Sequence, residues 1–341
     1  MACIKIVMNC PLSAAKLAII VAVSALGVSS SGHAADRVLP LTLQSLGIEA
    51  EARAGNADAE NRLGTRYLTG DGVARDPLIA RRWLARSAAQ GDAHAQYNLG
   101  VIFQRGLGTP ADLKSAEAFY RSSAQQNYAE AQFSLAALLA NNPKTSDEAV
   151  AWLQKAIGNG HAEAFYVLGL MQFNGIYMRP NHEAGLSLLT QAANKGVLGA
   201  QNQLGVIYGY GMGTPVNFPE SIKWTVRAAQ HGYAPAQTNL GIMYRTGHIL
   251  AHDDSKAMLW FLKAARQLNA DAALNIGILF VDGKMQDQGS VNADAWFAIA
   301  KTLGSAKADV NLKNISAKMS AEDLRLSKTL AFTILENMKL K

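Results

Sequence analysis

The sequence predicts an all-α protein, built as a solenoid of seven tandem helix hairpins with a further helix at each end. Three observations carry this prediction: a motif that recurs every 36 residues, apolar residues spaced three and four apart within each unit, and an alanine-rich composition with few β-branched or aromatic runs. Spacings of three and four are typical of amphipathic helices. A hairpin of two such helices cannot bury its apolar face alone, so successive hairpins must stack.

An alanine four residues into every unit marks the repeat. These alanines are Ala59, Ala95, Ala131, Ala164, Ala200, Ala236 and Ala272. The units start at Gly55 and step by 36 residues, apart from a shorter third unit of 33. The predicted units are 55–90, 91–126, 127–159, 160–195, 196–231, 232–267 and 268–304. Self-similarity at such a fixed period predicts one structural unit that is repeated along the chain.

Each unit also carries a leucine or isoleucine followed by glycine in its first helix, as in Leu63-Gly64. Only the third unit departs from this pair, with Leu135-Ala136. Glycine inside a helix costs about 1 kcal/mol relative to alanine, so we expect a close backbone approach that offsets the loss. The second helix carries a bulky residue that we expect to fill the space between neighbouring helices. These bulky residues are Trp83, Phe119, Trp152, Leu188, Trp224, Trp260 and Trp296.

The middle of each unit reads as a loop followed by a helix start. Glycines in this region are Gly70, Gly106, Gly175, Gly211, Gly247 and Gly283. The predicted N-caps of the second helix are Asp76, Asp112, Asn181, Asn217 and Asp253, because Asp and Asn accept hydrogen bonds from the first free backbone N–H groups. In the short third unit we expect Thr145-Ser146-Asp147-Glu148 to form a capping box. Each unit is therefore helix A, a loop, and helix B.

This layout resembles the Sel-one-like repeat (SLR) family of tetratricopeptide-like (TPR) solenoids, over about Gly55 to Gly304. The unit is longer than the TPR unit of about 34 residues. The resemblance implies a right-handed superhelical α/α fold of SLR/TPR-like hairpins, with A helices lining a concave face where partner proteins lie. It also implies a non-enzymatic scaffold or adaptor for protein–protein interaction, since exported members include regulators of sensor kinases and of exopolysaccharide production.

Residues 1–34 have the pattern of a secretory signal peptide. Lys5 and Lys16 precede the apolar stretch 17–28, and the small residues Gly32 and Ala34 suit cleavage after Ala34. The apolar stretch spans about 18 Å as a helix, against a hydrocarbon core of about 30 Å. We therefore expect export to a bacterial periplasm without stable membrane insertion after cleavage, with release from the cell as the alternative.

The predicted segments that flank the repeats are 35–54, with a leading helix, and 305–341, with a capping helix near 319–338. Both cysteines, Cys3 and Cys10, lie within the predicted signal peptide. The mature protein would then contain no disulfide and no thiolate metal site.

Motifs of catalysis are absent from the sequence: it contains no P-loop, GxSxG, HExxH or CxxC pattern. We therefore predict no catalytic residues, no cofactor and no metal. The pair His248 and His252 beside Asp253 and Asp254 could bind a metal, but Asp253 is expected to cap a helix, which favours a solvated loop. An envelope enzyme acting on peptidoglycan or β-lactams remains the alternative from another functional class.

The charge pattern bears on partners. The formal net charge of +6 is spread along the chain without a dense basic cluster, so nucleic acid is not an expected partner. The expected partners are proteins of unknown identity, and the oligomeric state is left open. The candidate contacts with a partner fall into two groups. One is the side-chain amides seven residues into the units, and the other is the cationic or aromatic residues toward the ends of the A helices. They are Asn98, Gln203, Asn239, Asn275, Arg66, Arg105, Tyr210 and Arg245.

Overall fold

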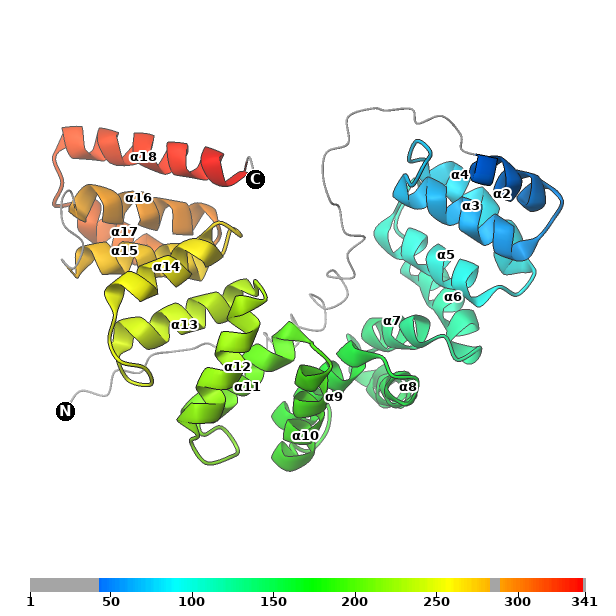
Figure 1. Cartoon of the computed structure of the whole chain (residues 1–341), viewed down its shortest axis with the longest axis horizontal. Coiled ribbons are helices and arrows are strands. Elements are labelled where there is room, and N and C mark those ends of the chain that lie inside the picture. The colour runs from blue at the N-terminus through cyan, green and yellow to red at the C-terminus, as the bar shows by residue number, and fades with distance from the viewer. Residues whose placement is uncertain (1–42, 283–288, 340–341) are drawn as a thin grey trace. The chain divides into compact units, whose positions relative to one another are not determined.

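The computed structural model describes residues 43–282 and 289–339, and all regular structure in these two ranges is helical. The predicted signal peptide and Gly283 lie outside the described residues. The chain divides into two compact units between Leu188 and Leu189. We refer to them as the N-terminal unit and the C-terminal unit. Successive helices follow one another along the chain in Figure 1.

The N-terminal unit begins with α2 (Leu43–Arg53), and hairpins follow it. Their helices are α3 (Ala57–Thr69) and α4 (Pro77–Ala89), α5 (Ala93–Arg105) and α6 (Leu113–Gln125), α7 (Ala129–Leu139) and α8 (Ser146–Gly158), then α9 (Ala162–Asn174) and α10 (His182–Asn194). The 3-10 helix η1 (Pro143–Thr145) precedes α8. The boundary between the two units falls within α10.

The C-terminal unit continues the pattern. Its helices after α10 are α11 (Leu198–Tyr210) and α12 (Phe218–Gln230), α13 (Ala234–Thr246) and α14 (Asp254–Ala265), α15 (Ala270–Val281) and α16 (Gly289–Thr302), then α17 (Ala308–Ser316) and α18 (Ala321–Lys339). The successive hairpins confirm the predicted all-α architecture, and α2 and α18 confirm the helices predicted at the two ends. Helix α17 is an element that the sequence pattern did not predict.

The predicted caps of the B helices are confirmed. The Asp76 carboxylate accepts hydrogen bonds from the backbone N–H groups of Leu78 and Ile79 at 2.9 and 3.0 Å. Equivalent caps form at Asp112, Asn181, Asn217 and Asp253.

The capping box predicted at Thr145 is wrong. The Thr145 hydroxyl donates instead to the carbonyl of Leu139 at 2.6 Å, and the side chain of Asn142 accepts from the N–H of Lys144 in η1. The third unit is three residues shorter than the others. Its chain therefore reverses through a tight 3-10 turn that includes Thr145, the first residue of the expected box.

The glycines of the A helices allow the two helices of a hairpin to approach closely. A Cβ added to Gly241 would lie 2.5 Å from a ring carbon of Phe261, and Gly100 has the same relation to Tyr120. These rings belong to the residue that follows the predicted bulky position. The sequence predicted a close approach at these glycines but not which side chain faces them, and successive helical residues differ by about 100° in direction. Trp260, at the predicted position, is half-buried beside the Lys263 ammonium, 4.2 Å from its ring.

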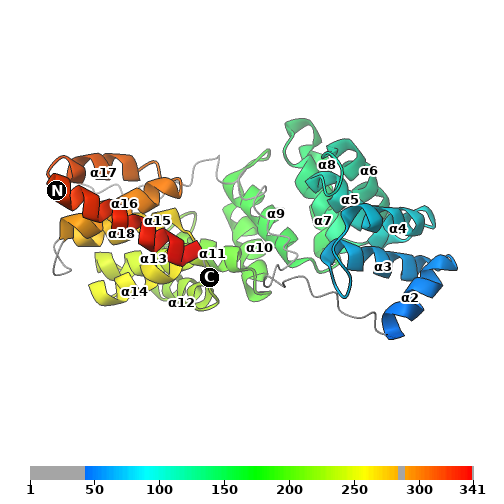
Figure 2. The same ribbon diagram turned by 90° about the horizontal axis from the view of Figure 1, so that it is seen from above.

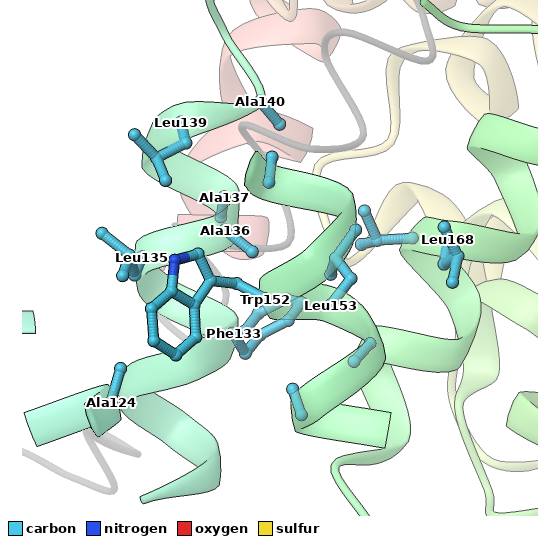
Figure 3. Packing of buried hydrophobic residues seen from close by; sticks show 14 of the residues in the cluster. Ala124, Phe133, Leu135, Ala136, Ala137, Leu139, Ala140, Trp152, Leu153 and Leu168 are labelled. Carbon is cyan, nitrogen blue, oxygen red and sulfur yellow. The ribbon is translucent and has the colours of Figure 1, made fainter. Parts of the chain in front are cut away.

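The predicted bulky residues are buried or half-buried among the side chains of neighbouring helices, as expected. In the N-terminal unit, Trp152 belongs to a buried cluster drawn from α6 to α9. Figure 3 shows its indole beside Leu135 and Phe133 of α7. The residue after the bulky one meets the glycine of its own hairpin, as Phe261 and Tyr120 do, while the bulky residue packs among side chains of several helices, as Trp152 does.

Consecutive hairpins are also joined by a polar link, which we call the glutamine relay. Gln132 of α7 donates to the Ala124 carbonyl at the end of α6 and accepts from the Asn159 amide at the end of α8, at 3.2 and 2.9 Å. Gln96 and Gln237 make the same two bonds in their hairpins. The relay satisfies buried helix-end carbonyls, which would otherwise cost free energy.

The relay is incomplete at Gln201. Its amide donates to the Ala193 carbonyl at 3.0 Å, but its buried Oε1 has no donor among the described residues. The equivalent of the donating Gln or Asn is His231, which instead donates from Nδ1 to the Arg227 carbonyl at 2.7 Å. A buried acceptor without a donor destabilises the fold.

We predict that Gly241→Ala destabilises the protein by about 1–3 kcal/mol, because the added methyl overlaps the Phe261 ring. Thermal or urea unfolding measures the change. Gly158→Ala is the matched control, since a Cβ there meets no atom within 4 Å. The control should be neutral or stabilising by up to about 1 kcal/mol. Equal effects of the two substitutions would contradict the close-approach explanation.

We also predict that His231→Gln stabilises the protein by about 1 kcal/mol, because the new amide can donate to Oε1 of Gln201 and complete the relay. A urea titration of single and double variants measures this gain. In a Gln201→Leu background, the same substitution should bring no gain. A gain that persists in that background would show that the stabilisation has another source.

Candidate functional site

The candidate site is the outward surface of the A helices, which are α3, α5, α7 and α9 in the N-terminal unit and α11, α13 and α15 in the C-terminal unit. In each A helix the repeated alanine and the leucine or isoleucine four residues after it face the core, so positions six and seven of the units lie on other faces. At these positions, amides of neighbouring A helices bond directly. Asn98 donates to the side chains of Asn61 and Thr65, at 3.3 and 3.2 Å.

The C-terminal unit repeats this arrangement. The Asn239 amide of α13 donates to the Asn202 side chain of α11 at 2.8 Å. Gln203 is half-buried beside Asn202 on α11. Asn275 differs, because it is buried and donates to the Asp271 carbonyl of its own helix at 2.8 Å. The structure therefore brings Asn239 and Gln203 onto neighbouring helices, while Asn275 is turned toward the protein.

The four predicted anchors divide between the two units. Arg66 is half-buried on α3, and Arg105 is exposed at the end of α5. In the C-terminal unit, Tyr210 ends α11 with 48% of its surface exposed. Arg245 of α13 is half-buried, and its buried Nε has no acceptor among the described residues. A buried N–H without an acceptor costs free energy.

Aromatic rings, which the sequence analysis did not single out, cover part of the A-helix surface in the N-terminal unit. Tyr97 of α5 contacts Tyr128 edge-on at a centroid distance of 5.3 Å, and Tyr128 also contacts His94 at 4.7 Å. Burial raises the pKa of Tyr128 to about 12. The sequence does contain these aromatic residues, Tyr97 six residues into one unit and Tyr128 one residue into the next. Only the stacked structure brings the two positions together.

His161 is a buried imidazole in the same unit. Its ring stacks on Phe133 at 4.4 Å, and its side chain is 7% exposed. Burial lowers its pKa, and the Glu163 and Glu130 carboxylates oppose this effect. The neutral ring is therefore the form that suits the folded protein.

The described residues contain no group of three His, Cys, Asp or Glu side chains placed to hold a metal ion. In the loop that the sequence left as a metal candidate, His252 contacts Asp254 through Nε2 at 3.0 Å and the Arg245 carbonyl through Nδ1 at 2.8 Å. Asp253 caps α14 as predicted. Within 43–282 and 289–339, no helix combines the length and apolar content needed to span a membrane.

Comparison with known proteins assigns the repeat. The model of the Sel1 repeat matches residues 57–92, 93–128, 129–161, 162–197, 199–233 and 234–267, which make up more than half of the chain. The chain belongs to the Sel1 repeat family. Hairpin α15–α16 follows the last matched Sel1 range and keeps the alanine, glycine and tryptophan of the repeat at Ala272, Gly277 and Trp296.

Two solved structures support the Sel1 assignment. A protective antigen of uropathogenic Escherichia coli with an SLR fold is 28% identical at a TM-score of 0.76, over 85% of this chain and 63% of its own length. This chain therefore spans less than two thirds of that protein. A Sel1 repeat protein from Oxalobacter formigenes is 28% identical at a TM-score of 0.59, over 63% of this chain and 89% of its own.

Sel1 repeat proteins generally serve as scaffolds for protein–protein interaction, and their fold is typically non-enzymatic. The Sel1 fold thus agrees with the class of partner expected for the A-helix surface.

We predict that His161 makes the stability of the N-terminal unit depend on pH. The unfolded imidazole, with a pKa of about 6.5, takes up a proton more readily than the folded one. Stability is therefore highest above pH 6.5 and falls as the pH drops below it. His161→Phe should lose less stability than the wild type between pH 7.5 and 5.5 in chemical unfolding.

His94→Phe is the control for this prediction. It removes an exposed imidazole from the same aromatic surface. The loss of unfolding free energy between pH 7.5 and 5.5 should be the same in this variant as in the wild type. If His161→Phe loses as much stability as the wild type between pH 7.5 and 5.5, other groups cause the pH dependence.

Proposed function

We propose that this Sel1 repeat protein is an exported scaffold of the bacterial cell envelope, which binds partner proteins along its A helices. The observation that carries the proposal is the polar surface of α11 and α13. There the Asn239–Asn202 amide pair lies on helices that also carry Gln203, Tyr210 and the half-buried Arg245. The partner would contribute to signalling or to exopolysaccharide or envelope assembly.

The chemistry of this surface favours a protein ligand. An amide has two N–H donors and an oxygen with two lone pairs, so Asn239 and Asn202 keep unused capacity after bonding to each other. They can bond to a partner's main chain without selecting its sequence. The Arg245 guanidinium supplies a directional donor for a carbonyl or a carboxylate. The exposed Tyr210 ring offers apolar area at low entropic cost.

Location in the periplasm rests on the pattern of Lys5, Lys16 and the apolar segment 17–28. Similarity to a protective antigen of uropathogenic Escherichia coli supports this part of the proposal. The second candidate is release from the cell to bind a host protein. Fractionation separates the two: periplasmic retention supports the scaffold, and mature chain confined to the culture supernatant supports release.

The test of binding is crosslinking in the native compartment, followed by mass spectrometry of the captured proteins and affinity measurement with the purified candidates. Asn239→Ala combined with Arg245→Ala should weaken binding of the true partner by about 10- to 100-fold, the range typical of interface hot spots. Both positions are half-buried on one helix, so circular dichroism must show an unchanged fold.

The matched control is Arg266→Ala, which removes an exposed cation at the end of helix B of the same hairpin. Its affinity for the partner should stay within about twofold of the wild type. Equal affinities of the double variant and the wild type for every captured partner would refute the role of this surface.

A further inference from the structure

Helices α11 and α13 share a face that carries no charge. They lie side by side in the C-terminal unit (Figures 1 and 2), where the Asn239 amide of α13 donates to the Asn202 side chain of α11 at 2.8 Å. Positions seven, ten and fourteen of a unit follow one side of helix A, because they are three and four residues apart. In α11 and α13 the side chains at these positions are half-buried or exposed, and none is charged. They are Gln203, Val206, Tyr210, Asn239, Ile242 and Thr246, and we call them the uncharged face.

The same positions carry charges in other hairpins. Arg62 and Arg105 occupy positions seven and fourteen in the first and second units. Three residues into the unit, α11 and α13 have Gly199 and Pro235. Four other A helices have an acid there, which the positive end of the helix dipole favours. These acids are Asp58, Glu130, Glu163 and Asp271. The lack of charge is therefore a property of α11 and α13 and not of the repeat.

Arg245 is the one charged side chain of α11 and α13. It directly precedes Thr246 in the chain and is half-buried, so it lies beside the row of the uncharged face. Its guanidinium can donate to a main-chain carbonyl as well as to a carboxylate. Arg245 therefore does not require a charged group on the partner.

An uncharged surface discriminates against charge in what it binds. A carboxylate or an ammonium group pressed against it would lose its hydration without gaining an opposite charge, which is costly. The side-chain amides of Gln203 and Asn239 instead offer donors and acceptors to a main chain. Val206, Ile242 and the Tyr210 ring, 48% of which is exposed, offer apolar contact. An extended segment has free N–H and C=O groups for such amides, whereas a helix uses its own groups internally.

We infer that the uncharged face takes an extended, uncharged segment of the partner protein. Its main chain bonds to the amides, and its small apolar or hydroxyl side chains contact Val206 and Ile242. This inference rests on the proposed function and specifies which chemistry α11 and α13 select in a partner. Neighbouring helices lie about 10 Å apart, and an extended chain advances about 3.3 Å per residue. About six residues therefore cross both helices.

Selection from a library of random peptides of about eight residues, with both ends blocked so that they carry no charge, tests the inference on the purified protein. Peptides that Tyr210→Ala weakens by about tenfold contact this face, since an exposed aromatic ring is a typical interface anchor. These Tyr210-dependent peptides should contain fewer Asp, Glu, Lys and Arg residues than the library. Their affinity should stay within about twofold between about 50 and 500 mM salt, because no ion pair is screened.

A charge placed on the face should change what it selects. Thr246→Lys should enrich Asp and Glu among the Tyr210-dependent peptides, and Thr246→Glu should enrich Lys and Arg. Thr69→Lys is the matched control. Thr69 is exposed at the same position of α3, and its hydroxyl donates to the carbonyl four residues earlier, as that of Thr246 does. The control should leave the composition of the Tyr210-dependent peptides unchanged, and circular dichroism verifies that each variant folds.

Tyr210-dependent peptides that carry charges as often as the library does would overturn the inference. So would a selection that yields no Tyr210-dependent peptide, or a Thr246→Lys variant that selects the same composition as the wild type. Each of these results overturns this inference alone, since capture of a partner in the native compartment tests the scaffold role separately.

Discussion

The contact between a glycine of helix A and a large side chain of helix B is the constraint on which this structure depends. At Gly241 the Phe261 ring occupies the space that a Cβ would need, and at Gly277 the Phe297 ring does the same. This contact sets how closely the two helices of a hairpin approach. Since the hairpin is then a defined unit, its remaining alanine faces can pack against the next hairpin with little loss of contact.

Polar bonds determine how the apolar hairpins are joined. In the glutamine relay, a long amide side chain reaches from one A helix to the last turn of the preceding B helix and is itself held by an amide from its own hairpin. A purely apolar contact would leave those carbonyls unsatisfied. The glutamines of the relay bond inside the stack, whereas amide pairs such as Asn239–Asn202 occupy the outer positions of the A helices.

The same principle governs the C-terminal end of the described chain. Asp294 is a buried charge, and such groups add little to stability unless their hydrogen bonds are complete. Here two serines from different helices complete them, so the carboxylate orients α17 and α18 on α16. The orientation that satisfies Asp294 turns Phe332 outward. The hydrogen bonds of a buried carboxylate thus determine which apolar side chain remains on the surface.

The sequence by itself determined the repeat, the order of the helices and the caps such as Asp76, because these depend on periodicity and on hydrogen bonds between residues close in the chain. It also identified the residue types of the candidate surface. Only the tertiary structure decided that Phe261 rather than Trp260 faces the glycine, that Asn275 is buried while Asn239 bonds across helices, and that Thr145 does not cap α8. Each of these depends on which group a side chain meets in the folded chain, as in the contacts Gly241–Phe261 and Asn239–Asn202, and the local pattern does not specify that partner.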